Sequence, residues 1–265
     1  MTLRAGVAGQ PISHSLSPLI HGLWIEAAGL DATYEAFGPA DAAGFAELVA
    51  KGRAGGLRGL HVTAPFKEQA LSLADGVSAM ARACGSANLV IFSDGRLSAD
   101  STDGEGLMAA LTEQAPALRP EGSAVVVLGA GGAARAAVAA LKAAGADVSV
   151  LNRTVARAEA LAADLGATVA GPDAVRDAAL IVNALSAPPE INIAALRSDA
   201  VLMDMTYKPL ITPFLAAGRA RGLTVVDGLA MLIGQAKPSF EALFGVAPPP
   251  VEVRAAVLRA LGETV

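Results

Sequence analysis

The sequence lacks the features that mark secreted, membrane-spanning or nucleic-acid-binding proteins. Its single cysteine, Cys84, cannot form an intrachain disulfide and suits a reducing compartment. Gly, Arg or Asp interrupts every apolar run well before the roughly 20 residues that a transmembrane helix needs. The N-terminal segment MTLRAGVAGQ has no long apolar core of the kind found in signal peptides. We therefore expect a cytoplasmic protein that does not enter a membrane.

The sequence also lacks an excess of basic residues. With a formal net charge of −5 and no basic stripe, neither nucleic acid nor an anionic membrane is an expected partner. Apolar residues are plentiful, at 53% of 265 residues, so the chain can bury a full core. A folded protein that acts on a small molecule is the expectation.

Short β-rich runs alternate with alanine-rich helical runs along the whole chain. This alternation predicts an α/β protein built from βαβ units, with parallel sheets covered by helices on both faces. In the first part, strands are expected over residues 3–9, 33–37 and 56–65, a helix over 18–28, a hairpin over 88–99 and a helix over 104–113. The hairpin prediction rests on Asp94-Gly95, which supplies the positive φ angles of a tight turn.

A second sheet is expected after the Pro-containing linker at residues 113–122. Its strands are predicted before Gly129 and near Val148, Ile181, Val201 and Val225. Residues 227–245 are predicted to be helical with a break at Pro238, because proline lacks the amide hydrogen that a helix interior uses. Another helix is expected after the proline run at 248–250.

The segment VVVLGAGGAARAA has the form of a dinucleotide-binding turn. A strand ends at Gly129, and Gly131 and Gly132 lead into a helix, with Ala134 at a position that takes Gly or Ala. Glycines let the backbone approach a pyrophosphate, and the helix N-terminus offers free N–H groups. An ordinary glycine-rich turn is the alternative, but the order of strand, turn and helix favours a cofactor.

The following strand ends in Asn152, Arg153 and Thr154, with Arg157 one helical turn further on. The ribose of a dinucleotide lies at this strand end, where an NAD-specific site prefers Asp or Glu. Guanidinium groups suit a 2′-phosphate instead, because they supply charge and a planar fork of donors. NADP is therefore the predicted cofactor, unless the two arginines are only solvated residues of a helix start.

Two further segments place reactive side chains at helix starts. In HVTAPFK, Lys67 follows Thr63 and Pro65, and a helix N-terminus can ready an amine for proton transfer. In STDGEG, Asp103 precedes a predicted helix. A solvated lysine and a helix-capping aspartate are the plain structural alternatives.

The segment SHSLSP carries two serines just before a predicted helix. In a purely structural role, Ser17 caps the helix that Pro18 begins and Ser15 is a turn residue. In a functional role, the two hydroxyls orient a carboxylate at the helix N-terminus, which favours an anion.

Taken together, the chain resembles the shikimate dehydrogenase family over nearly its full length. The resemblance rests on six blocks in order, namely ISHSLSP, HVTAPFK, GSAN, STDGEG, GAGGAARA followed by NRT, and MDMTYKPLITPF with VDGLAMLIGQA. It implies a substrate-binding α/β domain formed by residues 1–102 and 237–265, and a Rossmann-type NADP domain formed by residues 103–236. It also implies reversible hydride transfer between NADPH and the ring carbonyl of 3-dehydroshikimate, a step of aromatic amino-acid biosynthesis.

The resemblance also implies roles for individual residues. Lys67 and Asp103 match the catalytic pair, with Lys67 as proton donor and Asp103 as its electrostatic partner. The residues implied to bind the substrate, a cyclohexene carboxylic acid, are Ser15, Ser17, His61, Thr63, Asn88, Tyr207 and Gln235. The residues implied to bind the cofactor are Gly129, Ala130, Gly131, Gly132, Ala133, Asn152, Arg153, Thr154, Arg157 and Gly228. No metal site is expected.

Several positions depart from the family pattern. His61 and Ser101 replace usual asparagines, Leu89 and Leu185 replace usual threonines, and Gly22 stands where asparagine is common. His61 and Leu89 bear on substrate identity, so quinate or an amino-substituted analogue is an alternative substrate. A non-catalytic sensor that binds NADP or a metabolite is an alternative function, and a monomer or homodimer is expected.

Overall fold

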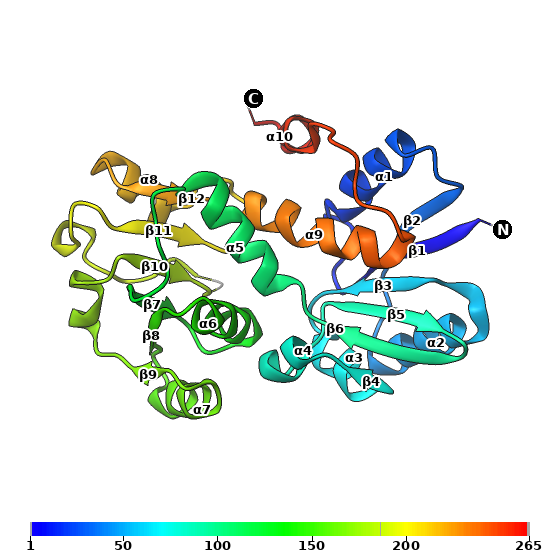
Figure 1. The fold of residues 1–265 in the computed structure, drawn as a ribbon, viewed down its shortest axis with the longest axis horizontal. Coiled ribbons are helices and arrows are strands. Elements are labelled where there is room, and N and C mark those ends of the chain that lie inside the picture. Colours follow the sequence, from blue (N-terminus) through cyan, green and yellow to red (C-terminus); the bar gives the residue numbers. More distant parts are fainter. Residues whose placement is uncertain (1, 186, 264–265) are drawn as a thin grey trace. The chain divides into compact units, whose positions relative to one another are not determined.

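The computed structural model describes residues 2–185 and 187–263. The chain forms two compact units, one of Met1–Thr102 with Ala236–Val265 and the other of Asp103–Gln235 (Figure 1). Each unit contains one six-stranded sheet, which confirms the predicted α/β class.

The sheet of the first unit has the strand order β2-β1-β3-β5-β6-β4. Its strands are β1 (Leu3–Ala8), β2 (Ala32–Phe37), β3 (Gly59–Val62), β4 (Gly76–Val77), β5 (Leu89–Ser93) and β6 (Arg96–Asp100). The predicted hairpin is confirmed, because Asp94 and Gly95 adopt φ angles of 51° and 75° between antiparallel β5 and β6. β5 also runs antiparallel to β3, so this sheet is mixed, although β1, β2 and β3 are parallel.

The helices of the first unit are α1 (Ser17–Ala27), α2 (Ala42–Lys51), α3 (Lys67–Ser72), α4 (Ala79–Cys84) and α10 (Val253–Leu261), with a π-helical turn at Gly52–Gly56. α1 packs on β1 and β2 (Figure 1). One face of the sheet is packed by a core that includes Phe45, Leu60 and Val90. α10 begins after the proline run, as predicted.

The sheet of the second unit is entirely parallel, with the order β12-β11-β10-β7-β8-β9. Its strands are β7 (Ala124–Leu128), β8 (Asp147–Leu151), β9 (Thr168–Val169), β10 (Leu180–Asn183), β11 (Val201–Asp204) and β12 (Thr224–Val226). This is the strand order of dinucleotide-binding folds, in which chain order reverses between the first and fourth strands, here β7 and β10.

Helices cover both faces of this sheet (Figure 1). They are α5 (Asp103–Gln114), α6 (Gly132–Ala143), α7 (Val155–Leu165) and α8 (Pro213–Ala220), with 3₁₀ turns at Pro172–Arg176 and Ile193–Ala195. Because side chains alternate along a strand, Val125 and Val127 enter one core while Val126 and Leu128 enter the other. Burial on both faces explains why β7 reads as a continuous apolar run.

The last long helix, α9 (Gly228–Phe244), runs through Pro238 without interruption, so the predicted break is wrong. Proline removes one hydrogen bond and its ring crowds the carbonyl four residues earlier, here that of Gly234. Packing compensates, because Ala236, Ser239 and Phe240 around the proline are all buried. Local propensity was therefore overridden by tertiary contacts.

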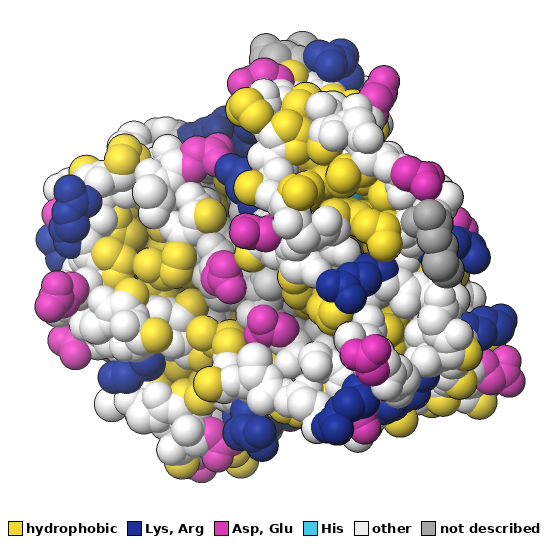
Figure 2. Space-filling view, turned by 45° about the vertical axis from the view of Figure 1, so that its right-hand side comes forward, with side chains coloured by type: hydrophobic (Ala, Val, Ile, Leu, Met, Phe, Trp, Pro, Cys, Tyr) yellow, Lys and Arg dark blue, Asp and Glu magenta, His cyan; other side chains and the backbone are white. Residues whose placement is uncertain are grey.

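The described helices include none that combines the length and the apolar character of a membrane span. On the face of the molecule in Figure 2, basic and acidic side chains are interspersed among apolar and neutral ones. That face carries no continuous basic stripe, in keeping with the charge composition.

Candidate active site

Four of the predicted site segments follow or precede strands at the same edge of the first unit's sheet. β1 and β3 end there, and Thr63 follows β3 directly. Asn88 precedes antiparallel β5 and Asp103 follows β6 at the same edge, since Leu89 pairs with both His61 and Asp100. Ligands of α/β sheets bind beyond the carboxyl ends of the parallel strands, so this edge is the expected place for a site.

Of the two serines of SHSLSP, Ser15 closes a turn as the structural alternative predicts, because its N–H donates to the carbonyl of Ile12 at 3.0 Å, but Ser17 does not cap the helix. α1 begins at Ser17, and its N-cap is Leu16, which makes no side-chain capping bond. The N–H of Ser17 instead donates to Oγ of Ser15 at 3.3 Å. Ser17 is therefore not the capping residue, because it is already the first residue of the helix.

The segments after β1 and β3 approach each other closely. The N–H of Gln10 donates to the carbonyl of Ala64 at 3.0 Å, and the N–H of Thr63 donates to the carbonyl of Ala8 at 2.9 Å. A Cβ on Gly9 would lie 2.3 Å from Cγ2 of Thr63, so any side chain at position 9 would displace Thr63. The glycine of GQPISHS thus lets Thr63 lie against the serine-bearing segment.

Asn88 is buried and forms hydrogen bonds with both the hydroxyl and the backbone N–H of Thr102. Its Nδ2 donates to Oγ1 of Thr102 at 3.0 Å, and its Oδ1 accepts from the Thr102 N–H at 2.8 Å. Oγ1 of Thr102 also lies 3.1 Å from Oγ of buried Ser239. This network fixes the residue that immediately precedes Asp103, so Asn88 orients the start of α5.

Asp103 is the first residue of α5 and is buried, while Lys67 is the first residue of α3 and is half-buried. Both therefore stand at helix starts, as predicted. The carbonyl of Lys67 accepts from the N–H of Ala87, which ties α3 to the segment before Asn88.

α5 and α9 cross at two glycines. A Cβ on Gly106 would lie 2.6 Å from the carbonyl oxygen of Met231 and 2.7 Å from Cβ of Gln235. A Cβ on Gly234 would lie 3.0 Å from the carbonyl oxygen of Gly106. Gly106 is one turn beyond Asp103 on the same helix face, so the crossing brings Gln235 close to the helix that carries the aspartate.

His61 belongs to an aromatic cluster that sequence reasoning did not find. Its Nδ1 lies 2.5 Å from the hydroxyl of Tyr34. The ring of Tyr34 stacks on that of His21, with centroids 4.1 Å apart and an interplanar angle of 3°. Trp24 and Phe240 complete the cluster around His21.

Burial shifts two groups of this cluster. It raises the pKa of Tyr34 well above its usual value, although the nearby Ser17 side chain acts in the opposite direction. It lowers the pKa of His21 well below the usual value, and the electrostatic influence of neighbouring His61 lowers it further. Both side chains are therefore neutral near pH 7.

In the second unit, the glycine turn lies where the strand order reverses. Gly129 adopts a φ of 113°, a conformation that side-chain-bearing residues rarely take, and lies against Ala184 and Leu185 beyond β10. Gly131 is the N-cap of α6, makes no side-chain capping bond, and a Cβ there would meet open space. The free helix N-terminus and the open surface of the turn suit a pyrophosphate.

The ribose-side residues fit a 2′-phosphate. Asn152 Nδ2 donates to the carbonyl of Thr154 at 2.9 Å, which shapes the turn after β8. Arg153 and Arg157 are exposed, and within residues 2–185 and 187–263 neither guanidinium has a hydrogen bond or ion pair. Two guanidinium groups that have no other partner among the described residues can both donate hydrogen bonds to a dianionic phosphate.

Asp204, at the end of β11, is a buried residue that sequence reasoning missed. Its carboxylate accepts from Thr212 Oγ1 at 2.7 Å, from Asn183 Nδ2 at 3.1 Å and from the Thr206 N–H at 3.0 Å. These bonds hold both ends of the loop that carries Tyr207, whose pKa is raised by burial. An aspartate directly after an apolar strand was the available sequence signal.

Gly228 has a structural reason to be glycine. A Cβ there would lie 2.6 Å from the carbonyl carbon and oxygen of Thr206. α9 can therefore start against the loop that carries Tyr207 only without a side chain at this position. Its place in the cofactor set stays a prediction.

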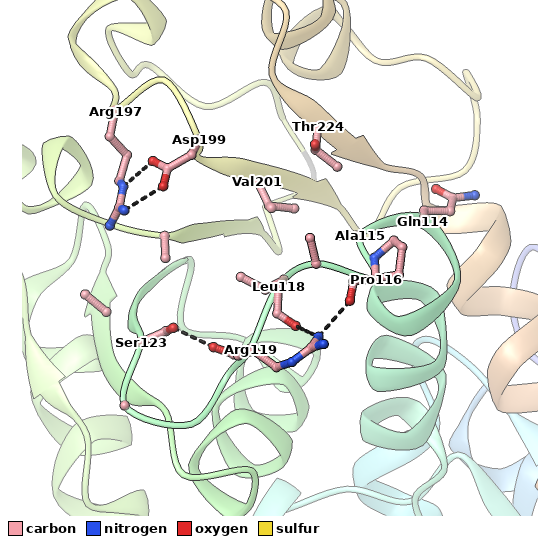
Figure 3. A pocket seen from close by; sticks show the side chains of 14 residues that line it. Gln114, Ala115, Pro116, Leu118, Arg119, Ser123, Arg197, Asp199, Val201 and Thr224 are labelled. Atoms are coloured by element: carbon pink, nitrogen blue, oxygen red, sulfur yellow. Dashed lines mark hydrogen bonds and ion pairs between the residues drawn. The ribbon is translucent and has the colours of Figure 1, made fainter.

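A pocket of about 720 Å³ lies at the opposite edge of the second sheet (Figure 3). It is lined by Ala124, Val201 and Thr224, at the amino ends of β7, β11 and β12. Its arginines are already engaged, Arg119 with backbone carbonyls and Arg197 with Asp199. We do not assign it to the cofactor, because dinucleotides bind at the carboxyl ends of the strands.

Comparison with known proteins covers almost the whole chain. Residues 7–90 match the shikimate dehydrogenase substrate binding domain, and residues 112–198 match the shikimate / quinate 5-dehydrogenase family. Shikimate dehydrogenase (NADP(+)) of Caulobacter vibrioides is 51% identical, with 97% of this chain and 95% of the relative covered. The corresponding protein of Mesorhizobium japonicum is 45% identical over 97% of this chain and 96% of its own.

A solved structure agrees with this result. Shikimate 5-dehydrogenase from Thermus thermophilus, in complex with NADP(H) and shikimate, superposes with a TM-score of 0.90 at 38% identity. The similarity covers 98% of this chain and 100% of that one.

Proposed function

Because the chain belongs to the shikimate dehydrogenase family, we propose that it catalyses the reversible NADP-dependent reduction of 3-dehydroshikimate to shikimate. The observation that carries the proposal is the 51% identity, over 97% of the chain, with an NADP-dependent shikimate dehydrogenase. The protein is thus an oxidoreductase acting on a CH–OH group.

Lys67 and Asp103 carry the proton chemistry. NADPH supplies the hydride when it is bound. Lys67 donates a proton to the oxygen of the reduced carbonyl, and Asp103 holds that hydroxyl and the ammonium group in place. The support is positional: both residues begin helices, and the buried network of Asn88 and Thr102 fixes the start of α5.

Ser15 and Ser17 bind the carboxylate of the substrate. Two hydroxyl donors at the start of α1 suit an anion without adding a positive charge. The remaining substrate contacts are assigned to His61, Thr63, Asn88, Tyr207 and Gln235. Residues 1–102 and 237–265 form the substrate domain.

Residues 103–236 form the NADP domain. The turn from Gly129 to Ala133 takes the pyrophosphate, with Ala130, Gly131 and Gly132 between them. Asn152, Arg153, Thr154 and Arg157 take the ribose and its 2′-phosphate. Gly228 lies near the nicotinamide. The open turn and the two uncommitted guanidinium groups support these assignments.

The test is a panel of shikimate and quinate, each crossed with NADP and NAD, followed as cofactor reduction from neutral to alkaline pH. Shikimate with NADP should give the highest kcat/KM. Rapid turnover of quinate without turnover of shikimate would reassign the substrate. Calorimetric binding of NADP without turnover of any acid would favour the sensor alternative.

The protein is further proposed to act in the cytoplasm on small molecules, as a monomer or homodimer. Sedimentation equilibrium with and without NADP and shikimate distinguishes the two assemblies.

A further inference from the structure

Asp204 is a buried carboxylate of the second unit that has no part in the proposed chemistry. It is only 2% exposed and is the last residue of β11. β11 lies inside the sheet, between β10 and β12. Ligands of α/β sheets bind beyond the carboxyl ends of the parallel strands, which is the edge where Asp204 stands. Since a carboxylate is costly to bury without partners, the groups that it bonds indicate its role.

Three neutral donors surround the Asp204 carboxylate. Oδ2 accepts from Thr212 Oγ1 at 2.7 Å and from Asn183 Nδ2 at 3.1 Å, and Oδ1 accepts from the Thr206 N–H at 3.0 Å. A carboxylate only accepts hydrogen bonds, so it satisfies all three donors at once. An asparagine amide cannot, because its NH₂ group would face a donor whichever way the amide is turned. The site thus requires aspartate rather than its amide isostere.

Two of these donors stand at opposite ends of one loop, formed by residues 205–211 between β11 and α8. Thr206 is the second residue of the loop and directly precedes Tyr207. Thr212 follows the loop and is the N-cap of α8, where its Oγ1 accepts from the Leu215 N–H at 3.3 Å. One carboxylate therefore ties the start of the loop to its end.

The neighbouring strand sets the orientation of the carboxylate. Asn183 is the last residue of β10 and pairs with Asp204 on β11, so the two side chains lie on the same face of the sheet. Oδ1 of Asn183 accepts from the Leu185 N–H at 3.2 Å, which leaves Nδ2 to donate to Asp204. The position of Asp204 is therefore fixed by sheet register and does not depend on the loop.

The start of α9 encloses the same part of the loop. A Cβ on Gly228 would lie 2.6 Å from the carbonyl oxygen of Thr206. The N–H of Thr206 is thus held by Asp204, and its carbonyl, which belongs to the peptide bond with Tyr207, is held against α9. The backbone directly before Tyr207 has contacts on both peptide groups.

We propose that Asp204 is a positioning residue for the reaction, which holds the loop of residues 205–211 so that Tyr207 meets the substrate. In this role Asp204 acts only through Tyr207. The inference rests on the proposed function, in which Tyr207 is assigned to the substrate.

Fluorine NMR reads the surroundings of Tyr207 directly, because the chain has only two tyrosines. Full-length protein labelled with 3-fluorotyrosine gives a signal for Tyr207, assigned through Tyr207→Phe, and one for Tyr34 of the other unit as an internal reference. Asp204→Asn should keep the bonds to Thr212 and Asn183 and lose that to the Thr206 N–H. We expect the Tyr207 signal to shift or broaden while the Tyr34 signal stays in place. An unchanged Tyr207 signal would overturn the proposal.

A double-mutant cycle tests whether the effect on the reaction passes through Tyr207. With shikimate and NADP, Tyr207→Phe and Asp204→Asn should each lower kcat/KM for shikimate about tenfold, the usual worth of one hydrogen bond. On the Tyr207→Phe background, Asp204→Asn should lower it by less than about twofold. Additive losses would show that Asp204 acts independently of Tyr207 and would overturn the proposal.

Thr212 offers a matched pair of variants at the other end of the loop. Thr212→Val removes the hydroxyl that donates to Asp204, and Thr212→Ser keeps it. The valine variant should change the Tyr207 signal and lower kcat/KM as Asp204→Asn does, and the serine variant should behave like wild type. Equal behaviour of the two variants would overturn the proposal, and this pair decides it even where Asp204→Asn does not fold.

Asp41→Ala separates positioning from a loss of stability. It removes the N-cap of α2 in the other unit, where Asp41 Oδ1 accepts from the Gly44 N–H at 2.9 Å, as Thr212→Val removes that of α8. Both variants should lower the midpoint of urea unfolding, but only Thr212→Val should lower kcat/KM. An equal loss of kcat/KM in Asp41→Ala would attribute the effect to destabilisation and overturn the proposal.

The failure of the proposed function has a different signature. Turnover of shikimate by wild type, with kcat/KM unchanged in Asp204→Asn, would overturn the role of Asp204 and leave the proposed function standing. A wild-type protein that neither binds nor oxidises shikimate would reject the proposed function, and the role of Asp204 in that reaction with it.

Discussion

His21 is fully buried, and neither of its ring nitrogens has a hydrogen-bond partner among the described residues. Burying such polar atoms costs about 1–3 kcal/mol each. The cost is offset by ring packing, since His21 contacts Tyr34, Trp24 and Phe240. His21 therefore acts as an aromatic packing surface for the rings of Tyr34, Trp24 and Phe240.

Stability should therefore depend on pH through His21. Burial, and to a smaller extent His61, lowers the pKa of His21 in the folded state. As the pH falls, the imidazole is therefore protonated in the unfolded chain before it is protonated in the folded chain, and this favours unfolding. The contribution of the neutral imidazole to stability is complete above about pH 6.5 and is lost as pH falls below that value, by up to about 1.4 kcal/mol per pH unit. Urea unfolding at pH 7.5, 6.5 and 5.5 should show a smaller loss in His21→Leu than in wild type.

His14→Ala is the matched control, since His14 is exposed and its loss should leave the wild-type pH dependence in place. Equal pH dependence in wild type and His21→Leu would contradict the prediction.

Removal of Lys67 or Asp103 should impair the reaction far more than binding. Lys67→Ala and Asp103→Asn are expected to lower kcat by about 10²–10⁴, the usual contribution of a positioned acid or base. The affinity for NADP, measured by calorimetry, should change by less than about threefold. Equal losses of rate and NADP affinity would argue against the assigned roles.

At the scale of elements, the crossing of α5 and α9 depends on glycines that have no side chain to separate the helices. Gly106 and Gly234 face each other there, and a Cβ on Gly106 would lie 2.6–2.9 Å from backbone and Cβ atoms of α9. Real Cβ atoms do not approach backbone this closely, so either helix would have to shift. α5 carries Asp103, which links this packing to the site.

Gly106→Ala should therefore destabilise the fold by about 1–3 kcal/mol through overpacking. Gly22→Ala is the matched control, because it lies within α1 and a Cβ there would meet nothing within 4 Å. That change should stabilise by about 0.5–1 kcal/mol, since alanine is the better helix former. Urea denaturation of both variants checks the opposite signs, and two changes of the same sign would refute this account.

At the scale of the whole molecule, the chain builds two units, each with its own sheet and apolar core. It leaves the first unit after Thr102 and returns to it at Ala236, inside α9. The unit of Asp103–Gln235 is therefore an insertion into the other. The residues proposed to bind NADP all belong to the unit of Asp103–Gln235, so NADP should stabilise the folded chain through that unit.

NADP at about 100 times its Kd should add about 2.7 kcal/mol to the free energy of unfolding, because it binds only the folded state. Scanning calorimetry should show the transition moving to higher temperature. In Arg153→Ala/Arg157→Ala most of this shift should disappear at the same NADP concentration, while the response to shikimate persists. A double variant that responds to NADP like wild type would exclude the arginines from the cofactor site.

The sequence by itself determined the features that depend on neighbours along the chain. Alternating strand and helix runs predict the α/β class, Asp94-Gly95 predicts the hairpin, and the glycines after Leu128 predict the turn into α6. The ordered blocks predict the family. In each case the geometry follows from local φ and ψ preferences or from a contiguous pattern.

Tertiary structure decided what depends on contacts between distant segments. Pro238 lies inside a helix because buried neighbours hold it there. Tyr34 meets His61 only because β2 and β3 flank β1 in one register. Asp204 gains its partners from β10 and from the start of α8. Strand register and helix packing arise from burial of whole faces, and no short stretch of sequence encodes them alone.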